Sequence, residues 1–190
     1  EAVTEPDLDL NWDATGEAGG LVGEDWSHIN GLSYHPDSDA YYMTSEGFDS
    51  IIAVDGTTGE TLWELAAGPS DWSSPEGPLV SSPHSVERLD GNRLLVFNRS
   101  PTTSASSEAL EIALDFDGGE ATPAWLGQAD NQPFVYWLGN AERLQSGETL
   151  VSWSSAGQID LLDGDNTSLL RLSLDQDQTF SFVTNVPSLY

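Results

Sequence analysis

The sequence predicts an all-β protein, a β-propeller whose blades are four-stranded antiparallel sheets. Two observations predict the strands. Helical periodicity is almost absent, and short apolar runs alternate with Asp-, Gly- and Asn-containing turns along the 190 residues. A third observation predicts the architecture, because a unit of four strands in about 40 residues, the size of one propeller blade, recurs three times.

The first blade occupies residues 25–70. It is divided by two turns, Asp37-Ser38-Asp39 and Thr57-Thr58-Gly59, whose residue types favour tight reversals of the chain. The runs between these turns are rich in aromatic and β-branched residues, as strands are. Its four strands are expected at 29–36, 40–47, 50–56 and 60–66.

The same order of strands and turns returns in two further blades, residues 80–128 and 135–176. Their first strands are alike, since "SVERLDGN" at 85–92 corresponds to "NAERLQSG" at 140–147. The strands of the second blade are expected at 84–91, 92–100, 108–118 and 121–127, and those of the third at 139–147, 148–157, 158–165 and 168–175.

The fourth strand of each blade carries a bulky apolar residue: Trp63, Trp125 or Leu172. The outermost strand of a propeller blade packs against the next blade. We therefore expect these three side chains to be inter-blade core and not ligand-stacking platforms.

Three blades do not close a ring, because propellers have four to eight. Residues 1–24 are interpreted as the end of a preceding blade plus a loop, and residues 179–190 as a closing strand. The chain, 1–190, is thus a single propeller domain or the C-terminal portion of one. An N-terminal portion or another chain is expected to complete the ring, since an open ring exposes an apolar face and a strand edge.

The composition excludes several classes of partner. The chain has 32 Asp plus Glu against five Lys plus Arg, for a net charge of −27 and a pI near 4.1. Such a surface repels nucleic acid and anionic membranes, and no apolar run approaches the ~18 residues that membrane insertion needs. Acidic residues spread along the whole chain favour a saline environment over divalent-cation binding as the reason for the charge.

Two histidines stand where chemistry is expected. His28 and Asn30 lie at the start of the innermost strand of the first blade, and His84 lies at the same point of the second. Loops at the starts of inner strands surround the channel of a propeller. The two imidazoles are therefore expected to converge at the channel mouth, with Asp25 or Asn30 fixing the tautomer of His28. His35 is expected to be an exposed turn residue.

These stretches resemble the arylsulfotransferase family. The resemblance runs from about residue 25 to 190. It rests on "DWSHINGLSYHPDSDAYYMTSEGFDSIIAVDGTTGETLWEL" at 25–65, "SPHSVERLDGNRLLVFNRS" at 82–100, "SSEALEI" at 106–112, "GNAERLQSGETLVSWSSAGQI" at 139–159 and "VPSLY" at 186–190. It implies a six-bladed propeller, secreted or periplasmic, that moves a sulfuryl group from an aryl sulfate to a phenol through a histidine intermediate. In this resemblance His28 matches the nucleophile, Asn30 a hydrogen-bond donor beside it, and His84 a second histidine that binds sulfate oxygens.

The sequence departs from the family at two cations. Glu46 stands where the family has a sulfate-binding arginine, and Glu108 stands where a second arginine is common. Arg99 is either a replacement cation near the channel or a solvated loop residue. The alternative function is therefore a secreted, non-catalytic propeller that acts as a binding or assembly module.

Neither cofactors nor metals are assigned. "DFDGGE" at 115–120 and "DGDNTS" at 163–168 resemble parts of calcium loops, but neither completes the twelve-residue pattern. Both are interpreted as hairpin turns, in which Asp, Asn and Gly tolerate positive φ.

Overall fold

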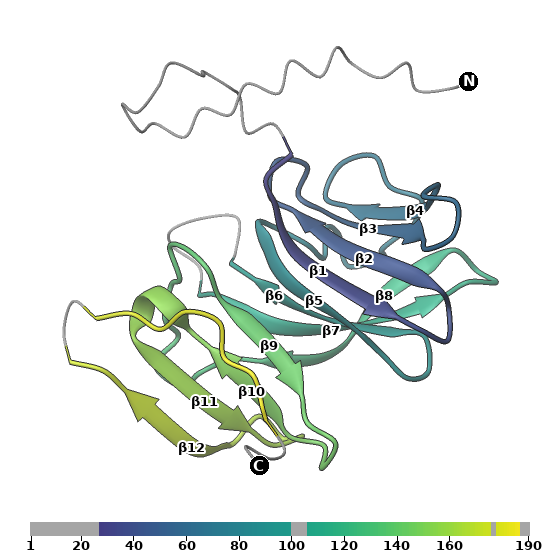
Figure 1. Cartoon of the computed structure of the whole chain (residues 1–190). Helices are drawn as coiled ribbons and strands as arrows, with labels where there is room; N and C mark the ends of the chain where they lie inside the picture. The colour runs from purple at the N-terminus through teal and green to yellow at the C-terminus, as the bar shows by residue number, and fades with distance from the viewer. Residues whose placement is uncertain (1–26, 100–105, 176–177, 187–190) are drawn as a thin grey trace, which may run out of the picture.

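The computed structural model describes residues 27–99, 106–175 and 178–186. Three four-stranded antiparallel sheets form there, which confirms the predicted all-β fold and its three blades (Figure 1). The strands are β1 (Ile29–His35), β2 (Ala40–Ser45), β3 (Ser50–Asp55) and β4 (Thr61–Ala66) in the first sheet; β5 (Pro83–Leu89), β6 (Arg93–Asn98), β7 (Glu108–Asp115) and β8 (Glu120–Gly127) in the second; and β9 (Asn140–Arg143), β10 (Thr149–Ser152), β11 (Gln158–Leu162) and β12 (Ser168–Ser173) in the third.

Each sheet follows the order of the chain, and the first strands of the three sheets, β1, β5 and β9, are neighbours. This arrangement makes β1, β5 and β9 the inner strands. The strand expected at 148–157 is shorter than predicted. It ends at Ser152, and the 3-10 helix η1 (Ser154–Ala156) follows, closed by Gly157 in the left-handed conformation.

The turns between the third and fourth strands are alike in all three blades. Asp55, Asp115 and Asp163 each accept a hydrogen bond from the backbone N–H two residues later. These bonds fold the carboxylate back on its own turn. Segments 115–120 and 163–168 are thus the β7–β8 and β11–β12 hairpin turns, as interpreted.

Two apolar clusters hold the blades together, one on each face of the middle blade. In β6, Leu94 and Val96 belong to the cluster shared with the first blade, whereas Leu95 and Phe97 belong to the cluster shared with the third. Successive strand residues point to opposite faces, so the run "LLVF" is buried throughout.

The expected inter-blade packing holds for two of the three outer-strand residues. Trp63 is buried between the first and second blades, and Trp125 packs against the cluster between the second and third. The expectation for Leu172 is wrong, because its side chain is 51% exposed. No blade follows β12 among the described residues, so this side of the sheet has no inter-blade partner there.

The expected closing strand is not formed over 178–186. The segment instead runs along the third blade and is held by side chains. Asn140 exchanges two hydrogen bonds with the backbone of Val183, and Ser152 donates to the carbonyl of Ser181. The remainder of the predicted strand and the predicted earlier blade, 1–24, lie outside the described residues.

Two buried carboxylates, Glu111 and Asp160, together bind three arginines. Glu111 accepts from Arg93 and Arg143, each at 2.7 Å, and so joins the second blade to the third. Asp160, fully buried, accepts from Arg171 and from Trp153 Nε1, each at 2.8 Å. None of the described helical segments is long and apolar enough to cross a membrane.

Candidate functional site

The backbone brings His28 and Glu46 together. The N–H of Glu46 donates to the carbonyl of His28 at 3.1 Å, and the N–H of Gly47 donates to that of Ser27. This pairing extends the β1–β2 ladder past its last strand residues. It leaves His28 Nε2 3.4 Å from Glu46 Oε2, with 47% of the histidine side chain exposed.

Arg99 reaches this pair from the second blade. Its Nη2 forms an ion pair with Glu46 Oε1, and its Nη1 donates to the carbonyl of Tyr136 at 2.6 Å. Only 15% of the Arg99 side chain is exposed, so of the two alternatives for this residue the solvated loop is wrong. The structure therefore brings a cation, Arg99, next to Glu46.

His84 is buried close to the same groups. Burial, the positive charge of Arg99 and a smaller effect of His28 lower the pKa of His84 to about 4, against the opposing effect of a hydrogen bond with the backbone of Gly139. His84 Nδ1 is buried and has no partner among the described residues.

The sequence suggested that the two histidines occupy the same point of their blades. The structure shows that they do not. Pairing shifts by one residue between Ile29 and Gly31 in β1 and between His84 and Val86 in β5. His84 is therefore the counterpart of Ile29. Because neighbouring strand residues face opposite ways, this offset of one residue turns His84 inward while His28 stays accessible.

Asn30 lies at the bulge of β1. Its Oδ1 accepts from Thr44 Oγ1 at 2.8 Å, while its Nδ2 is buried without a partner among the described residues. Asp25, the other residue expected to orient His28, lies outside the described residues. Among the described residues Glu46 approaches the His28 ring, a contact that the sequence did not predict.

Three buried polar atoms of this site lack partners in the part of the chain that the structure describes: Asn30 Nδ2, His84 Nδ1 and Arg99 Nε. Buried polar groups are nearly always hydrogen-bonded, so each unpartnered atom requires an explanation. Asn30 Nδ2 and Arg99 Nε are donors, and His84 Nδ1 is a donor or an acceptor according to the tautomer of the ring. Unpaired donors of this kind have the chemistry to bind an oxyanion.

The backbone at this end of the blades is strained. His28, Ser85 and Leu138 are non-glycine residues with φ of 41°, 36° and 61°. Left-handed backbone costs about 1–3 kcal/mol at such residues and persists where the surrounding structure holds it in place.

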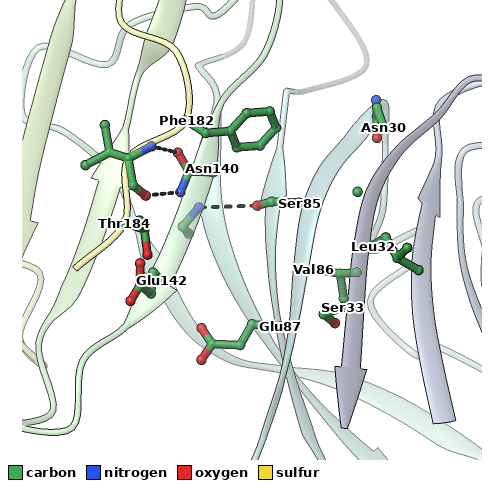
Figure 2. Close-up of a pocket in the computed structure, with 13 residues that line it drawn as sticks. Asn30, Leu32, Ser33, Ser85, Val86, Glu87, Asn140, Glu142, Phe182 and Thr184 are labelled. Atoms are coloured by element: carbon green, nitrogen blue, oxygen red, sulfur yellow. Dashed lines mark hydrogen bonds between the residues drawn. The ribbon is translucent and has the colours of Figure 1, made fainter. Parts of the chain in front are cut away.

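A groove of about 410 Å³ runs from this end along the inner strands (Figure 2). Phe182 lies at the groove beside His84, with ring centroids 5.6 Å apart. Glu87 and Glu142 line the opposite part, where burial and then the Glu142 charge raise the pKa of Glu87. Near the histidines the groove is lined by the polar Asn30 and the apolar ring of Phe182. Farther along β5 and β9 its lining is acidic.

Two other sequence candidates lie elsewhere. Glu108 is in contact with Asn98 Nδ2 and Gln128 Nε2, at 3.4 and 3.3 Å, and makes no described contact with the histidines. His35 is the last residue of β1, partly buried, with Nδ1 3.2 Å from Ser38 Oγ. No group of three or more metal-ligating side chains occurs among the described residues.

Comparisons with known proteins agree with the fold and the resemblance. Residues 7–117 match the model of the family described as Arylsulfotransferase (ASST). No curated protein sequence matches the chain.

Three solved structures share the fold. Hydrazine synthase of Kuenenia stuttgartiensis is 17% identical, with a TM-score of 0.52 over 85% of this chain and 40% of that one. A putative 6-phosphogluconolactonase from Bacteroides uniformis is 16% identical, with a TM-score of 0.50 over 85% and 43%. The PQQ-bound aldose sugar dehydrogenase of Streptomyces coelicolor is 14% identical, with a TM-score of 0.50 over 74% and 46%.

These structures are β-propellers, so the predicted propeller fold is confirmed. The chain spans less than half the length of each of them. At this identity the likeness concerns the fold alone.

Proposed function

Because the chain belongs to the arylsulfotransferase (ASST) family, whose model matches more than half of it, we propose that it carries out sulfuryl transfer. The donor is an aryl sulfate, the acceptor is a phenol, and a histidine holds the sulfuryl group between them. The observation that carries this proposal is the convergence of His28, Glu46 and Arg99, with His84 buried nearby.

Arg99 is the cation that this proposal needs. Glu46 occupies its Nη2 and the Tyr136 carbonyl occupies its Nη1, but its Nε is buried and unpartnered. The guanidinium therefore keeps one unused donor while it binds Glu46, and this proposal assigns that donor to a sulfate oxygen. Asn30 Nδ2 offers a second donor. Charge-assisted and preorganised donors of this kind stabilise the negative charge that builds up on the transferring group.

In the first half of the reaction, a ring nitrogen of His28 attacks the sulfur of the aryl sulfate. The N–S bond forms, the S–O bond to the aryl group breaks, and the aryl oxide leaves with the electron pair. His28 is assigned this role because its side chain is half exposed and within reach of a substrate, and because Glu46 orients its ring.

In the second half, the oxygen of the acceptor phenol attacks the same sulfur, the N–S bond breaks, and the imidazole is restored. The proton of the phenol passes to a carboxylate of the site, of which Glu46 is the one next to the His28 ring. The acceptor is assigned to the groove along the inner strands, which Asn30 and Phe182 line. One histidine thus serves both halves of the exchange.

His84 keeps its expected place as the second histidine, and its buried Nδ1 has no partner among the described residues. Its pKa, lowered to about 4, keeps the ring neutral at pH 7, so His84 is also a second imidazole able to take the sulfuryl group. Identifying the labelled histidine decides between His28 and His84.

The test is turnover of 4-nitrophenyl sulfate in the presence of phenol, followed by the release of 4-nitrophenolate. Release that depends on phenol and is lost in His28→Ala supports the proposal, and His35→Ala serves as the matched control, since His35 lies at the far end of β1. An intact protein that shows no release at any salt concentration contradicts it.

One observation favours a non-catalytic binding module as a second candidate. Glu46 neutralises Arg99, the cation that would attract a sulfate. In that case His28→Ala changes stability or binding, and neither the unchanged protein nor the variant consumes aryl sulfate.

The proposal includes the setting of the protein. A net charge of −27 suits an extracellular or periplasmic, saline environment, because salt screens the repulsion between carboxylates. Apolar residues are exposed on the first and third blades, for example Leu32 and Leu172. This exposure suits a ring completed by an N-terminal portion or another chain. Size-exclusion chromatography with light scattering, at low and high salt, tests both points.

A further inference from the structure

Three aromatic side chains gather on the loop that precedes β9. The rings of Phe134 and Tyr136 meet edge to face with centroids 5.0 Å apart, and those of Tyr136 and Trp137 lie 6.2 Å apart. Tyr136 is 64% exposed and Trp137 is 53% exposed. Contiguous exposed aromatic surface of this kind usually marks a binding site, since burial would otherwise be favourable.

The loop is fixed to the proposed site by its backbone. Arg99 Nη1 donates to the Tyr136 carbonyl, and the Tyr136 N–H donates to Ser155 Oγ at 2.7 Å. The fully buried Ser107 donates to the Arg99 carbonyl and accepts from the N–H of Val135. The loop is therefore held in place while its aromatic rings face outward.

The same loop touches both charged parts of the site. Its last residue, Gly139, makes the backbone hydrogen bond with His84, and the carbonyl of Tyr136 binds the guanidinium that pairs with Glu46. On its other side Trp137 lines a cavity of about 430 Å³ together with Ser155, Gln178 and Thr179. A flat ring therefore has an aromatic surface on the loop that binds Arg99, and a recess beside Trp137.

We infer that Tyr136 and Trp137 form the subsite for the aryl ring of the substrate, with the sulfate group directed toward Arg99. This inference rests on the proposed function and adds the residues that select for aromatic substrates. The net charge of −27 gives the protein no long-range attraction for the sulfate group of the substrate. Stacking on the uncharged aryl ring therefore supplies attraction that the charge does not. A rigid, preorganised loop also limits the entropy lost on binding.

The test uses two readouts. The first is the KM for phenyl sulfate and for 2-naphthyl sulfate, which has the larger ring. The second is calorimetric binding of naphthalene-2-sulfonate, which carries no transferable sulfuryl ester and so needs no turnover. The variants are Trp137→Ala and Tyr136→Ala, which keep the backbone groups that hold Arg99. Tyr34→Ala is the matched control, an aromatic residue of β1 that is 49% exposed.

Loss of one stacking ring should weaken naphthalene-2-sulfonate binding about fivefold and raise the KM for 2-naphthyl sulfate by a similar factor, with kcat nearly unchanged. The effect on phenyl sulfate should be smaller, and Tyr34→Ala should change neither value. Turnover with unchanged KM and unchanged sulfonate binding in both variants overturns the inference and leaves the proposed function standing. Sulfonate binding that depends on Trp137 without any turnover supports the aryl subsite and contradicts the transferase.

Discussion

Asp160 offers the sharpest test of how the third blade is held together. Its carboxylate is fully buried and accepts hydrogen bonds from Trp153 Nε1, Gln158 Nε2, Ser168 Oγ and Arg171 Nε, at 2.6–2.8 Å. Burial alone would raise the pKa of Asp160, but the hydrogen bonds from Arg171, Ser168, Gln158 and Trp153 outweigh it and lower the pKa. The carboxylate is therefore strongly stabilised in the folded state.

The alanine variant, Asp160→Ala, leaves the indole N–H of Trp153 buried and unpaired, and leaves Gln158 Nε2 with only a 3.4 Å bond to Asn131. An unpaired buried donor costs about 1–3 kcal/mol, and the loss of the buried ion pair with Arg171 adds to this cost. We expect a loss of about 4 kcal/mol in the free energy of unfolding, within the range for breaking a buried ion pair. For a chain of this size that corresponds to a fall in Tm of roughly 8–16 °C.

The assay is urea and thermal unfolding followed by circular dichroism at high salt. Asp163→Ala is the matched control, since Asp163 is a carboxylate of the same blade whose bonds stay within its own turn. It should cost about 1 kcal/mol or less. A loss below about 1 kcal/mol for Asp160→Ala, or equal losses for the two variants, would refute the reasoning.

Three further predictions concern the site and its surroundings. Burial lowers the pKa of His84 from 6.5 to about 4, so the folded protein binds fewer protons than the unfolded one in that interval. Stability should therefore fall by up to about 3 kcal/mol as the pH drops from 6.5 to 4, and His84→Gln should remove most of this loss in pH-dependent unfolding. Gly31→Ala should destabilise the protein by about 1–3 kcal/mol in urea unfolding, because its Cβ would lie 2.9 Å from the Cα of Ser85 and 2.4 Å from Thr44 Oγ1. Gly164→Ala, where no atom lies within 4 Å of the added Cβ, is its control. Arg99→Ala should reduce kcat/KM for 4-nitrophenyl sulfate about a hundredfold or more, and an unchanged value would remove Arg99 from the mechanism.

The strands could be predicted because their signals are local. The turn residues at Asp37-Ser38-Asp39 and Thr57-Thr58-Gly59 and the alternating apolar runs suffice to place all four strands of the first blade. The same kind of signal gave a wrong prediction for the segment after Leu174. "TFSFV" alternates like a strand, but side chains of β9 and β10 bind it in place of a backbone ladder.

The site could be predicted only in part. The sequence singles out His28 and His84 by their positions, but the one-residue offset between them comes from bulges that no residue pattern in either strand reveals. The pairing of Arg99 with Glu46 spans 53 residues, and only the packing of two blades brings them together. The aromatic loop carried a signal that was missed, since "FVYW" at 134–137 is unusually aromatic for a segment between blades.

The central claim is that a histidine of this site carries the sulfuryl group. The most direct measurement is mass spectrometry of peptides from protein mixed with 4-nitrophenyl sulfate in the absence of acceptor. The account predicts the added mass of one sulfuryl group on the peptide that contains His28, or on the one that contains His84, and its disappearance when phenol is added. A protein that releases 4-nitrophenolate while both peptides stay unmodified would contradict it.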